Sequence, residues 1–310
     1  KPSHKECLIP VKPAYLHRLT LRQIEVFLAV ARLRSYSRAA DELALTQPAV
    51  SAQIRQLEDL VGEALFDYLG KQLYLTSIGE VMERAGRDLV QRLVTLEMEL
   101  SEVRGVMQGG LNLAVESSAQ YFVPGALKEF CDLHPAVSVQ MRVVNHADAL
   151  KSLAENSDDL VVMSLVPEDR ALAFVPFREN TLLAVARPDH PLAGVAEISL
   201  LQLIGQTVLL REPGSGTRRA FEIHCQQQAV RLQHVQQLGS LEAVKQGVSA
   251  GLGVAVLPRE ACAAELADGR LIALDVKGFP LRRSWCAVHP RGKHLTPVAQ
   301  TFLSFLTAMR

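Results

Sequence analysis

The stretch 37-SRAADELALTQPAVSAQIRQLEDLVG-62 decides the fold of the first part of the chain. Ser37 is a suitable N-cap for a short helix with apolar residues on one side, and Thr46 starts a second helix. Pro48 stands in the first turn of this second helix, where proline is tolerated, and Gly62 follows its last apolar residue. The pattern therefore predicts two helices joined by a tight turn.

Helical spacing of apolar residues also precedes this stretch, from Thr20 onward, and predicts a first helix. Three short helices with a tight turn between the second and the third form a helix-turn-helix. After Gly62, apolar residues alternate around Gly70-Lys71, which is typical of a small β-hairpin, or wing. We therefore predict a winged helix-turn-helix over residues 19–77.

A long helix is predicted next, with Thr76 as its N-cap and Gly109-Gly110 at its end. Its apolar positions alternate threes and fours for about four heptads, which leaves an apolar seam on one side. Such a seam favours pairing with a second copy of the chain over burial in a core. Residues 78–109 are therefore predicted to be a linker helix that makes a homodimer. The seam consists of Ile78, Met82, Ala85, Leu89, Leu93, Leu96, Leu100, Val103 and Met107.

The remainder of the chain, residues 110–310, alternates short β-rich runs with helical stretches. This alternation predicts an α/β domain with a largely parallel sheet. About two hundred residues of such units favour two lobes over one. Lobe I is predicted to contain residues 110–186 and 287–310, and lobe II residues 187–286. The fold class predicted for the whole chain is α + α/β.

The composition limits the classes of function. A chain of 310 residues exceeds one ordinary core, and 48% hydrophobic with 21% charged residues describe a soluble globular protein. Lys plus Arg (33) equals Asp plus Glu (33), so any contact with nucleic acid must be inferred from local patterns. No apolar run approaches the ~18 residues of a membrane span, so we expect no membrane partner. Residues 1–18 mix charges with prolines and are predicted to be a disordered extension.

Five cysteines without a C-x-x-C pair predict neither a disulfide framework nor a zinc site, and they fit a reducing cytoplasm. Cys225 is either a buried idle thiol or a redox sensor. The nine histidines lack metal-ligand spacing, and the chain carries no nucleophile elbow, Walker loop or dinucleotide fingerprint. We therefore predict a protein that is not an enzyme and that holds no metal and no tightly bound cofactor.

The second helix of the tight-turn pair carries the residue types that read DNA in the major groove. Gln47 can pair with adenine, and Pro48 and Ala49 can contact a thymine methyl. Arg55 suits a guanine or a phosphate, and hydroxyls and charges around the helix can hold phosphates. The alternative for each side chain alone is solvation or a surface ion pair. The predicted contacts to double-stranded DNA are Ser37, Arg38, Thr46, Gln47, Pro48, Ala49, Ser51, Ala52, Gln53, Arg55 and Lys71.

These residues resemble the DNA-binding domain of the LysR family of bacterial transcriptional regulators. The likeness lies in residues 21–23 (LRQ), 46–51 (TQPAVS) and 54–58 (IRQLE), followed by 65–66 (LF). It covers the chain from about Leu19 to its end. The resemblance implies a winged helix-turn-helix, a dimerising linker helix and a two-lobed effector domain like a periplasmic binding protein. It also implies promoter DNA as a partner and a homotetramer built from two kinds of dimer.

A finer likeness is to the CbbR subgroup, which regulates the carbon-fixation operon of the Calvin cycle. It rests on residues 47–58 (QPAVSAQIRQLE), 69–76 (LGKQLYLT) and 211–218 (REPGSGTR). The subgroup usually has an apolar residue in place of Glu116 and Thr in place of Ser118, so the identity of the ligand stays open. The resemblance implies an activator of carbon-fixation genes that responds to a sugar phosphate, phosphoenolpyruvate or NADPH.

Two alternatives stand beside this prediction. One is LysR-type regulation of another metabolic operon, and the other is a solute-binding protein, which the two-lobed part alone would permit. The helix-turn-helix argues against the solute-binding protein. A regulator of transcription would work in the cytoplasm, with RNA polymerase as a further candidate partner.

A second candidate site lies in segment 210–219 (LREPGSGTRR), which follows a predicted strand and opens a helix. Free N–H groups at a helix N-terminus attract anions, and Arg218 adds a charge suited to carboxylate or phosphate. Strand residues 115–120 would bring hydroxyls to the same edge of the sheet. Glu116 would repel a phosphate unless Arg211 or Arg218 pairs with it. The alternative is an ordinary turn with capping hydroxyls. The predicted contacts to a small anionic metabolite are Glu116, Ser117, Ser118, Gln120, Ser164, Arg211, Gly214, Ser215, Gly216, Thr217 and Arg218.

Overall fold

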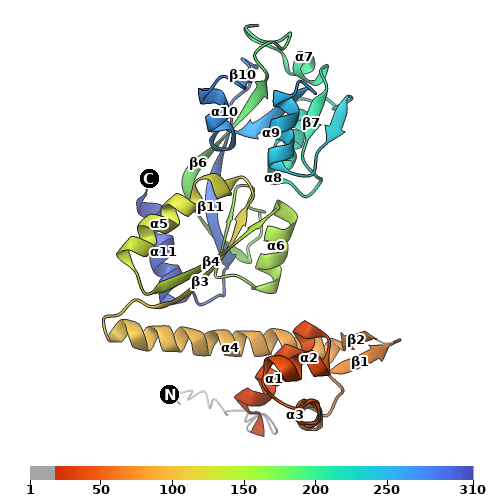
Figure 1. Cartoon of the computed structure of the whole chain (residues 1–310), viewed down its shortest axis with the longest axis vertical. Helices are drawn as coiled ribbons and strands as arrows, with labels where there is room; N and C mark the ends of the chain where they lie inside the picture. The colour runs from red at the N-terminus through yellow and green to blue at the C-terminus, as the bar shows by residue number, and fades with distance from the viewer. Residues whose placement is uncertain (1–17, 71, 310) are drawn as a thin grey trace, which may run out of the picture. The chain divides into compact units, whose positions relative to one another are not determined.

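The computed structural model describes residues 18–70 and 72–309 (Figure 1). The chain divides into two compact units, one ending at Glu97 and one beginning at Met98, and each is described by itself. The predicted disordered extension lies outside the described residues except for Arg18. Lys71, predicted to contact DNA, also lies outside them.

Three helices begin the first unit: α1 (Leu21–Leu33), α2 (Tyr36–Glu42) and α3 (Gln47–Val61). The helix begins after Thr46, as predicted, and Thr46 caps α3 because its hydroxyl accepts a hydrogen bond from the backbone N–H of Ala49. Gly62 ends α3 in the left-handed region, with φ of 80°, which only glycine adopts without strain. The three helices therefore follow the predicted tight-turn arrangement.

The N-cap of α2 is Ser35 rather than Ser37. Ser35 Oγ accepts a hydrogen bond from the backbone N–H of Arg38 at 3.3 Å. Because α1 ends at Arg34 in the left-handed region (φ 48°), the chain enters α2 two residues earlier than the sequence pattern predicts. Ser37 lies exposed in the first turn of α2. The prediction is wrong because either serine has the chemistry of a cap.

The three helices share one apolar core. From α3, the side chains of Val50, Ile54 and Leu57 face inward, and each is at most 1% exposed. From α1, Phe27 is fully buried and its ring centroid lies 5.4 Å from that of Phe66. Burial of this inner face holds α3 by one side only, which leaves its polar side in solvent.

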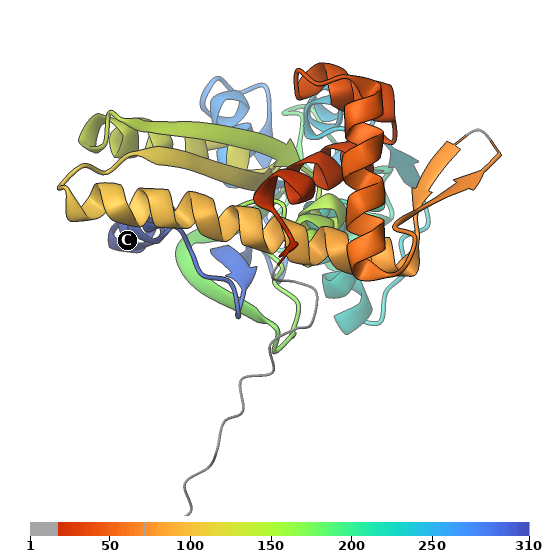
Figure 2. The same ribbon diagram turned by 90° about the horizontal axis from the view of Figure 1, so that it is seen from below.

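The wing consists of β1 (Phe66–Leu69) and β2 (Gln72–Leu75), which pair antiparallel and project from the three helices (Figure 2). Glu58 Oε1 accepts a hydrogen bond from the backbone N–H of Leu65 at 2.8 Å and joins α3 to the wing. A Cβ at Gly79 would lie 2.1 Å from the carbonyl oxygen of Leu65. Glycine therefore permits the close passage of the wing over the next helix.

That next helix is α4 (Ser77–Val103), the long helix predicted from the apolar seam. It ends earlier than the predicted boundary at residue 109, because Gly105 takes a positive φ of 78° and a strand begins at Gly109. No helix in the described part of the chain is both long and apolar enough to cross a membrane. Many apolar side chains of α4 stay between 39% and 87% exposed: Ile78, Val81, Leu89, Leu93, Val94, Leu96, Leu100 and Val103.

Two long antiparallel strands, β6 (Leu172–Ala186) and β11 (Leu281–Pro290), form the middle of the second unit. On one side the sheet continues with β5 (Leu160–Met163), β3 (Gly109–Glu116) and β4 (Val137–Val144). These three strands run parallel to one another, and β5 runs antiparallel to β11.

On the other side of β6 lie β9 (Val254–Pro258), β7 (Val208–Leu210) and β8 (Val235–Gln237), again parallel among themselves. The short β10 (Ile272–Ala273) pairs with β6. The prediction of a largely parallel sheet holds within each group of three. It is wrong for β6 and β11, which run antiparallel to every neighbour, because such long-range pairing leaves no local pattern in the sequence.

The two groups of strands define two lobes, each with its own helices (Figure 1). In lobe I, the core around Phe130 and Trp285 forms under α5 (Val123–Leu133) and α11 (Pro297–Ala308), and α6 (His146–Glu155) packs elsewhere on the strands. In lobe II, the helices are α7 (Leu200–Ile204), α8 (Gly216–Gln227), α9 (Leu241–Ser249) and α10 (Ala263–Ala267).

The chain crosses from lobe to lobe inside β6 and returns inside β11. Phe177 belongs to the core of lobe I and Leu182 to that of lobe II. In the same way, Leu281 packs in lobe II and Trp285 in lobe I. Both crossings therefore lie several residues before the boundaries predicted from the sequence, because each strand runs through the crossing without a break.

Candidate functional site

The polar side of α3 is exposed over its first turns. Gln47, Pro48, Ala52 and Arg55 are exposed, while the inner side of the helix is buried. Gln47 Nε2 donates a hydrogen bond to Ser51 Oγ at 3.1 Å, so the amide is already oriented along the helix surface. A surface of this kind, one exposed helix with polar and small side chains, has the shape that enters the major groove.

The other residues predicted to contact DNA surround this surface. Arg38 and Arg55 form no ion pair within residues 18–70 and 72–309, whereas Arg22 and Arg32 are paired with carboxylates. Arg38 donates to the carbonyl of Leu33 but meets no carboxylate there, so the charges of both guanidinium groups remain available for phosphates. The described residues of the predicted set that are exposed or half-buried are Ser37, Arg38, Thr46, Gln47, Pro48, Ala49, Ser51, Ala52, Gln53 and Arg55.

In the second unit, Glu116 ends β3 with its carboxylate buried, at 4% exposed. Glu116 Oε1 lies 2.6 Å from His146 Nδ1. Glu116 Oε2 accepts a hydrogen bond from the backbone N–H of Ser164 at 3.1 Å. The predicted partners, Arg211 and Arg218, do not pair with it, because both are held elsewhere. The carboxylate is therefore satisfied within lobe I.

The glycine-rich segment before α8 packs directly on these residues. A Cβ at Gly216 would lie 3.1 Å from Glu116 Oε1, and one at Gly214 would lie 3.3 Å from the Asn145 side chain. The carbonyl of Gly214 accepts a hydrogen bond from Ala147 N–H at 3.2 Å. The N-terminus of α8, predicted to hold an external anion, therefore already faces a carboxylate of the protein.

Hydroxyl groups join the two lobes beside this contact. Ser118 Oγ lies 3.2 Å from Thr217 Oγ1, and both residues are buried. Arg211 Nη1 donates to Ser117 Oγ at 3.0 Å, while its other nitrogens pair with Glu212. The serines of lobe I and the arginine of lobe II, predicted as separate parts of one site, therefore lie together. They supply hydroxyls and a guanidinium at the carboxyl edge of the sheet.

Arg218 is directed away from this cluster. Its Nε donates to Glu222 Oε1 at 2.7 Å, and Nη1 donates to the carbonyl of Arg211 and to Gln237. Ser215 caps α8 through the N–H of Arg218. Of the remaining predicted residues, Gln120 is half-buried in the short 3-10 helix η2 (Ala119–Tyr121), and Ser164 contacts Glu116.

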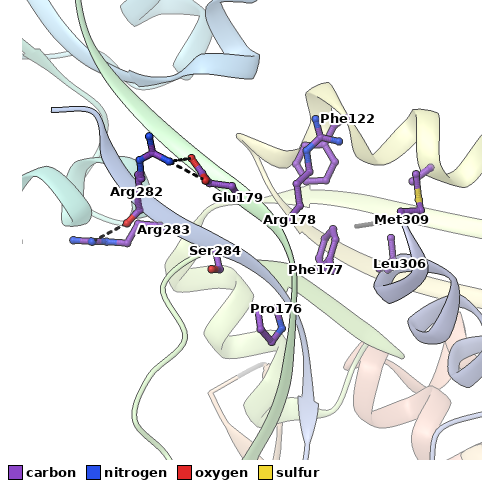
Figure 3. Close-up of a pocket in the computed structure, with 11 residues that line it drawn as sticks. Phe122, Pro176, Phe177, Arg178, Glu179, Arg282, Arg283, Ser284, Leu306 and Met309 are labelled. Carbon is purple, nitrogen blue, oxygen red and sulfur yellow. Dashed lines mark hydrogen bonds and ion pairs between the residues drawn. The ribbon is translucent and has the colours of Figure 1, made fainter. Parts of the chain in front are cut away.

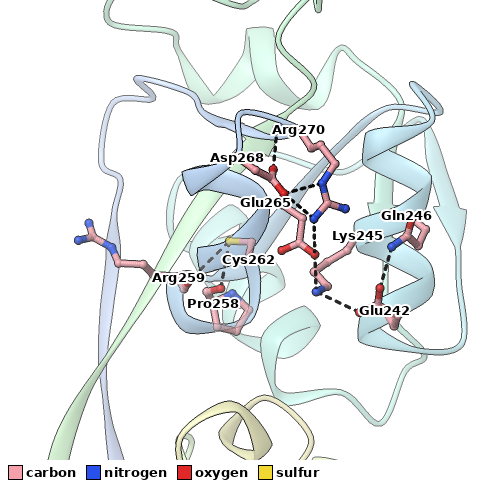
Figure 4. Close-up of polar contacts among 9 residues, drawn as sticks. All are labelled: Glu242, Lys245, Gln246, Pro258, Arg259, Cys262, Glu265, Asp268 and Arg270. Carbon is pink, nitrogen blue, oxygen red and sulfur yellow. Dashed lines mark hydrogen bonds and ion pairs between the residues drawn. The ribbon is translucent and has the colours of Figure 1, made fainter.

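A buried cation of lobe II, Lys245 on α9, was not among the predicted residues. Its Nζ lies 2.8 Å from Glu265 and 3.0 Å from Glu242 (Figure 4). It also lies 5.3 Å from the ring centroid of Tyr121 in lobe I. Two carboxylates therefore neutralise this lysine, and the aromatic ring adds a further contact between the lobes.

Two family models match the chain. One, described as bacterial regulatory helix-turn-helix protein, lysR family, matches residues 21–80, and the LysR substrate binding domain matches residues 104–310. The chain belongs to the LysR family. The predictions of the family, of the fold class and of a transcriptional regulator rather than an enzyme are confirmed.

Curated relatives of this LysR protein cover almost its whole length. The RuBisCO operon transcriptional regulator of Acidithiobacillus ferrooxidans is 43% identical over 293 residues, which are 94% of this chain and 95% of the relative. The HTH-type transcriptional regulator CbbR of Rhodospirillum rubrum is 38% identical over 288 residues, 93% of this chain and 96% of the relative. The predicted likeness to CbbR is therefore confirmed.

Solved structures agree with the fold. The CcmR regulatory domain of Synechocystis PCC6803, in complex with 2-PG, is 39% identical with a TM-score of 0.62 and covers 65% of this chain and 97% of that domain. Full-length CbnR complexed with its target DNA is 17% identical with a TM-score of 0.66, covering 94% of this chain and all of that one. At this identity the CbnR likeness concerns the fold alone.

His146 and Asn145, which lie beside the glycine-rich segment, were not among the predicted residues. A signal was present, because a carboxylate at the end of a buried strand needs a partner and His146 opens the following helix two residues past β4. The ion pair of Arg218 with Glu222 could also have been predicted from the sequence, because the two residues stand four positions apart on one helix.

Three buried cysteines of the second unit are suited to packing rather than to redox chemistry. Burial raises the pKa of Cys225, Cys262 and Cys286 to about 11 in each case. Cys262 also donates to the carbonyl of Pro258 (Figure 4). Thiols with such a pKa are protonated near neutral pH and react slowly with oxidants. Of the two roles predicted for Cys225, the structure favours the buried idle thiol.

The Glu116 contacts give a prediction for stability. Glu116→Leu removes the acceptor of His146 and of the Ser164 N–H, so it should lower the free energy of unfolding by about 2 kcal/mol. Glu116→Gln keeps one oxygen acceptor and should lose less. Denaturant unfolding followed by the fluorescence of Trp285, the single tryptophan and 1% exposed, measures lobe I directly.

The matched control is Glu129→Leu, because Glu129 is exposed on α5. It should change the free energy of unfolding by less than about 0.5 kcal/mol. A midpoint for Glu116→Leu equal to that of the control would show that the buried contacts do not stabilise lobe I.

Proposed function

We propose that this LysR-type regulator controls carbon-fixation genes of the Calvin cycle, binding their promoter DNA through α3 and a small anionic metabolite through the cluster between its lobes. The observation that supports DNA binding best is the exposed polar side of α3, with its inner side locked by Val50, Ile54 and Leu57. The names of the relatives, several of them RuBisCO operon or CbbR regulators, support the choice of target genes.

Base recognition would begin at the N-terminal turn of α3. Gln47 presents an amide that can bond adenine N6 and N7 together, and Ser51 one turn later holds that amide at 3.1 Å. Pro48 and Ala52 add apolar surface for thymine methyl groups. Arg38 and Arg55 would bind phosphates and fix the register of the helix in the groove.

A homodimer through α4 would give the protein two such helices. The 27 residues of α4 span about 40 Å and keep an exposed apolar side, which pairing with a second copy would bury. A two-fold dimer reads two half-sites of opposite orientation, so the promoter site would be a pseudo-palindrome. A tetramer and a contact with RNA polymerase are further parts of this proposal.

The effector would bind where Ser117, Ser118 and Thr217 meet Arg211. An anion there would accept hydrogen bonds from the three hydroxyls. It would also accept the hydrogen bond that Arg211 Nη1 donates to Ser117 Oγ in this structure. Glu116 does not repel it, since its oxygens are engaged by His146 and Ser164. The likeness to the CcmR domain makes 2-PG the first compound to test, ahead of sugar phosphates, phosphoenolpyruvate and NADPH.

Ligand binding would act by shifting the orientation of the lobes. The same hydroxyls that would hold the ligand now hold the lobes together, so a ligand that replaces these contacts changes the relative stability of the closed and open forms. In a DNA-bound dimer, that change alters the spacing of the two α3 helices. Such a mechanism would operate in the cytoplasm, together with promoter DNA.

DNA recognition is tested by gel shift with the promoter region upstream of RuBisCO genes. Gln47→Ala should weaken binding by at least about tenfold and Ser51→Ala by less, because the glutamine makes the base contacts. Glu129→Ala, in the second unit, is the control and should bind like the unchanged protein. A Gln47→Ala protein that binds the promoter as tightly as the unchanged protein, with the same preference over unrelated DNA, would contradict the assignment of α3.

Effector binding is tested by titration calorimetry of the full chain with 2-PG. Thr217→Val keeps the shape of the side chain but removes its hydroxyl, so it should weaken 2-PG binding by at least about tenfold. Ser304→Ala, an exposed hydroxyl on α11, should leave it unchanged. Binding of 2-PG with the same affinity by the Thr217→Val protein would place the effector elsewhere.

A further inference from the structure

A pocket of about 720 Å³ opens on β6 and β11 close to where these strands cross between the lobes (Figure 3). Its volume lies in the range of pockets that hold small organic molecules. None of the residues assigned above to the effector cluster lines it. The lining consists of Phe122, Ala126, Pro176, Phe177, Arg178, Glu179, Arg282, Arg283, Ser284, Leu306 and Met309.

One end of the pocket is apolar. Phe122 and Phe177 lie with their ring centroids 6.2 Å apart, and Leu306 and Met309 of the last helical turns close this end (Figure 3). Phe177 and Leu306 are almost completely buried, at 6% and 1% exposed, so their positions are fixed by the core of lobe I. This end can therefore hold a hydrocarbon body without rearrangement.

The other end is positively charged. Arg282 Nη1 lies 3.3 Å from Glu179 Oε2, and this is the one carboxylate among the lining residues. Arg283 forms no ion pair within the described part of the chain and donates to the carbonyl of Arg282. Burial and the Arg283 guanidinium lower the pKa of the neighbouring His224. With Glu260 of lobe II, which pairs with Arg178, the three arginines stand against two carboxylates and still leave a net positive charge.

Arg178 connects the two ends. Its guanidinium lies 4.6 Å from the ring centroid of Phe122, over the apolar end, and 3.8 Å from Glu260 of lobe II. Glu260 already pairs with Arg178, whose guanidinium lies as a flat cation over the aromatic ring. The pocket therefore offers an apolar surface and, at Arg282 and Arg283, cationic groups to the same molecule.

We infer that this pocket is a second ligand site, which takes a small organic acid with an apolar body and a single carboxylate. The body would lie against Phe122 and Phe177, and the carboxylate would pair with Arg282 in place of Glu179. A sugar phosphate would bury its hydroxyls unpaired at the apolar end, and a cation would meet three arginines. The apolar end and the arginines at the other end therefore favour an amphipathic monocarboxylate over a sugar phosphate or a cation.

Because the pocket lies on the strands that connect the lobes, a ligand bound there would influence the orientation of the lobes. β6 and β11 are the strands that carry the chain between the lobes, and both contribute lining residues. A molecule bound across both strands would favour one orientation of the lobes, whatever occupies the cluster between them. The protein would then respond to two metabolites of different chemistry.

The test is titration of the full chain with octanoate and with octanamide, which differs by lacking the charge. Octanoate should bind with one molecule per chain and octanamide at least about tenfold more weakly. Arg282→Ala should weaken octanoate binding to a similar degree. Because the Arg282 side chain is 70% exposed, this variant should fold normally. Arg219→Ala, an exposed arginine of α8 outside the pocket, is the matched control.

A second variant, Met309→Glu, places a carboxylate at the apolar end and should also weaken octanoate binding. Saturation with 2-PG should leave a separate octanoate site. The inference is overturned if octanoate does not bind, if octanamide binds equally, or if Arg282→Ala and Met309→Glu both bind like the Arg219→Ala control. The outcome does not depend on the target genes or on DNA binding.

Discussion

The antiparallel pairing of β6 with β11 is the constraint on which the effector-binding half of this LysR protein depends. Its register runs from Leu281 beside Leu182 to Pro290 beside Leu172, with an irregularity between Trp285 and Cys286. Each strand places side chains in the cores of both lobes, so the lobes are joined by continuous strands rather than by flexible linkers. The lobes can reorient only by bending this pair.

The contacts between the lobes are of a different kind. They are hydroxyl to hydroxyl at Ser118 and Thr217, guanidinium to hydroxyl at Arg211 and Ser117, and glycine against Glu116. Each such contact is worth only about 1 kcal/mol, far less than a lobe core. The strands therefore set which motion is allowed, and the polar contacts set the balance between its end states, which is where a ligand acts.

Local patterns predict much of this fold. The position of α3 follows from its apolar spacing, from a proline in its first turn and from Gly62 after its last turn. Each of these signals depends only on residues close together in the sequence. The choice of Ser35 over Ser37 does not follow, because both can cap and the preceding turn at Arg34 decides. The antiparallel course of β6 and β11 is also invisible locally, since their paired residues stand about a hundred positions apart.

The candidate sites, too, could be predicted from the sequence only in part. The residues of α3 lie within one helix, so their shared exposed side could be predicted, and so could the closeness of the two strand-end segments at the edge of the sheet. That the buried carboxylate of Glu116 needs a partner could also be predicted, but the identity of the partner could not be settled, because His146 reaches it from another element, 30 residues away. The pocket on β6 and β11 draws on residues from Phe122 to Met309 and exists only once the lobes have formed.

We propose that occupation of the effector-binding half changes how α3 is presented to DNA. DNase I footprinting of the full chain on the RuBisCO promoter region, with and without 2-PG, tests it most directly. We expect a protected pseudo-palindromic site whose protected length or internal cleavage pattern changes when 2-PG is added. A footprint that stays the same at saturating 2-PG, or protection without preference for any sequence, would contradict it.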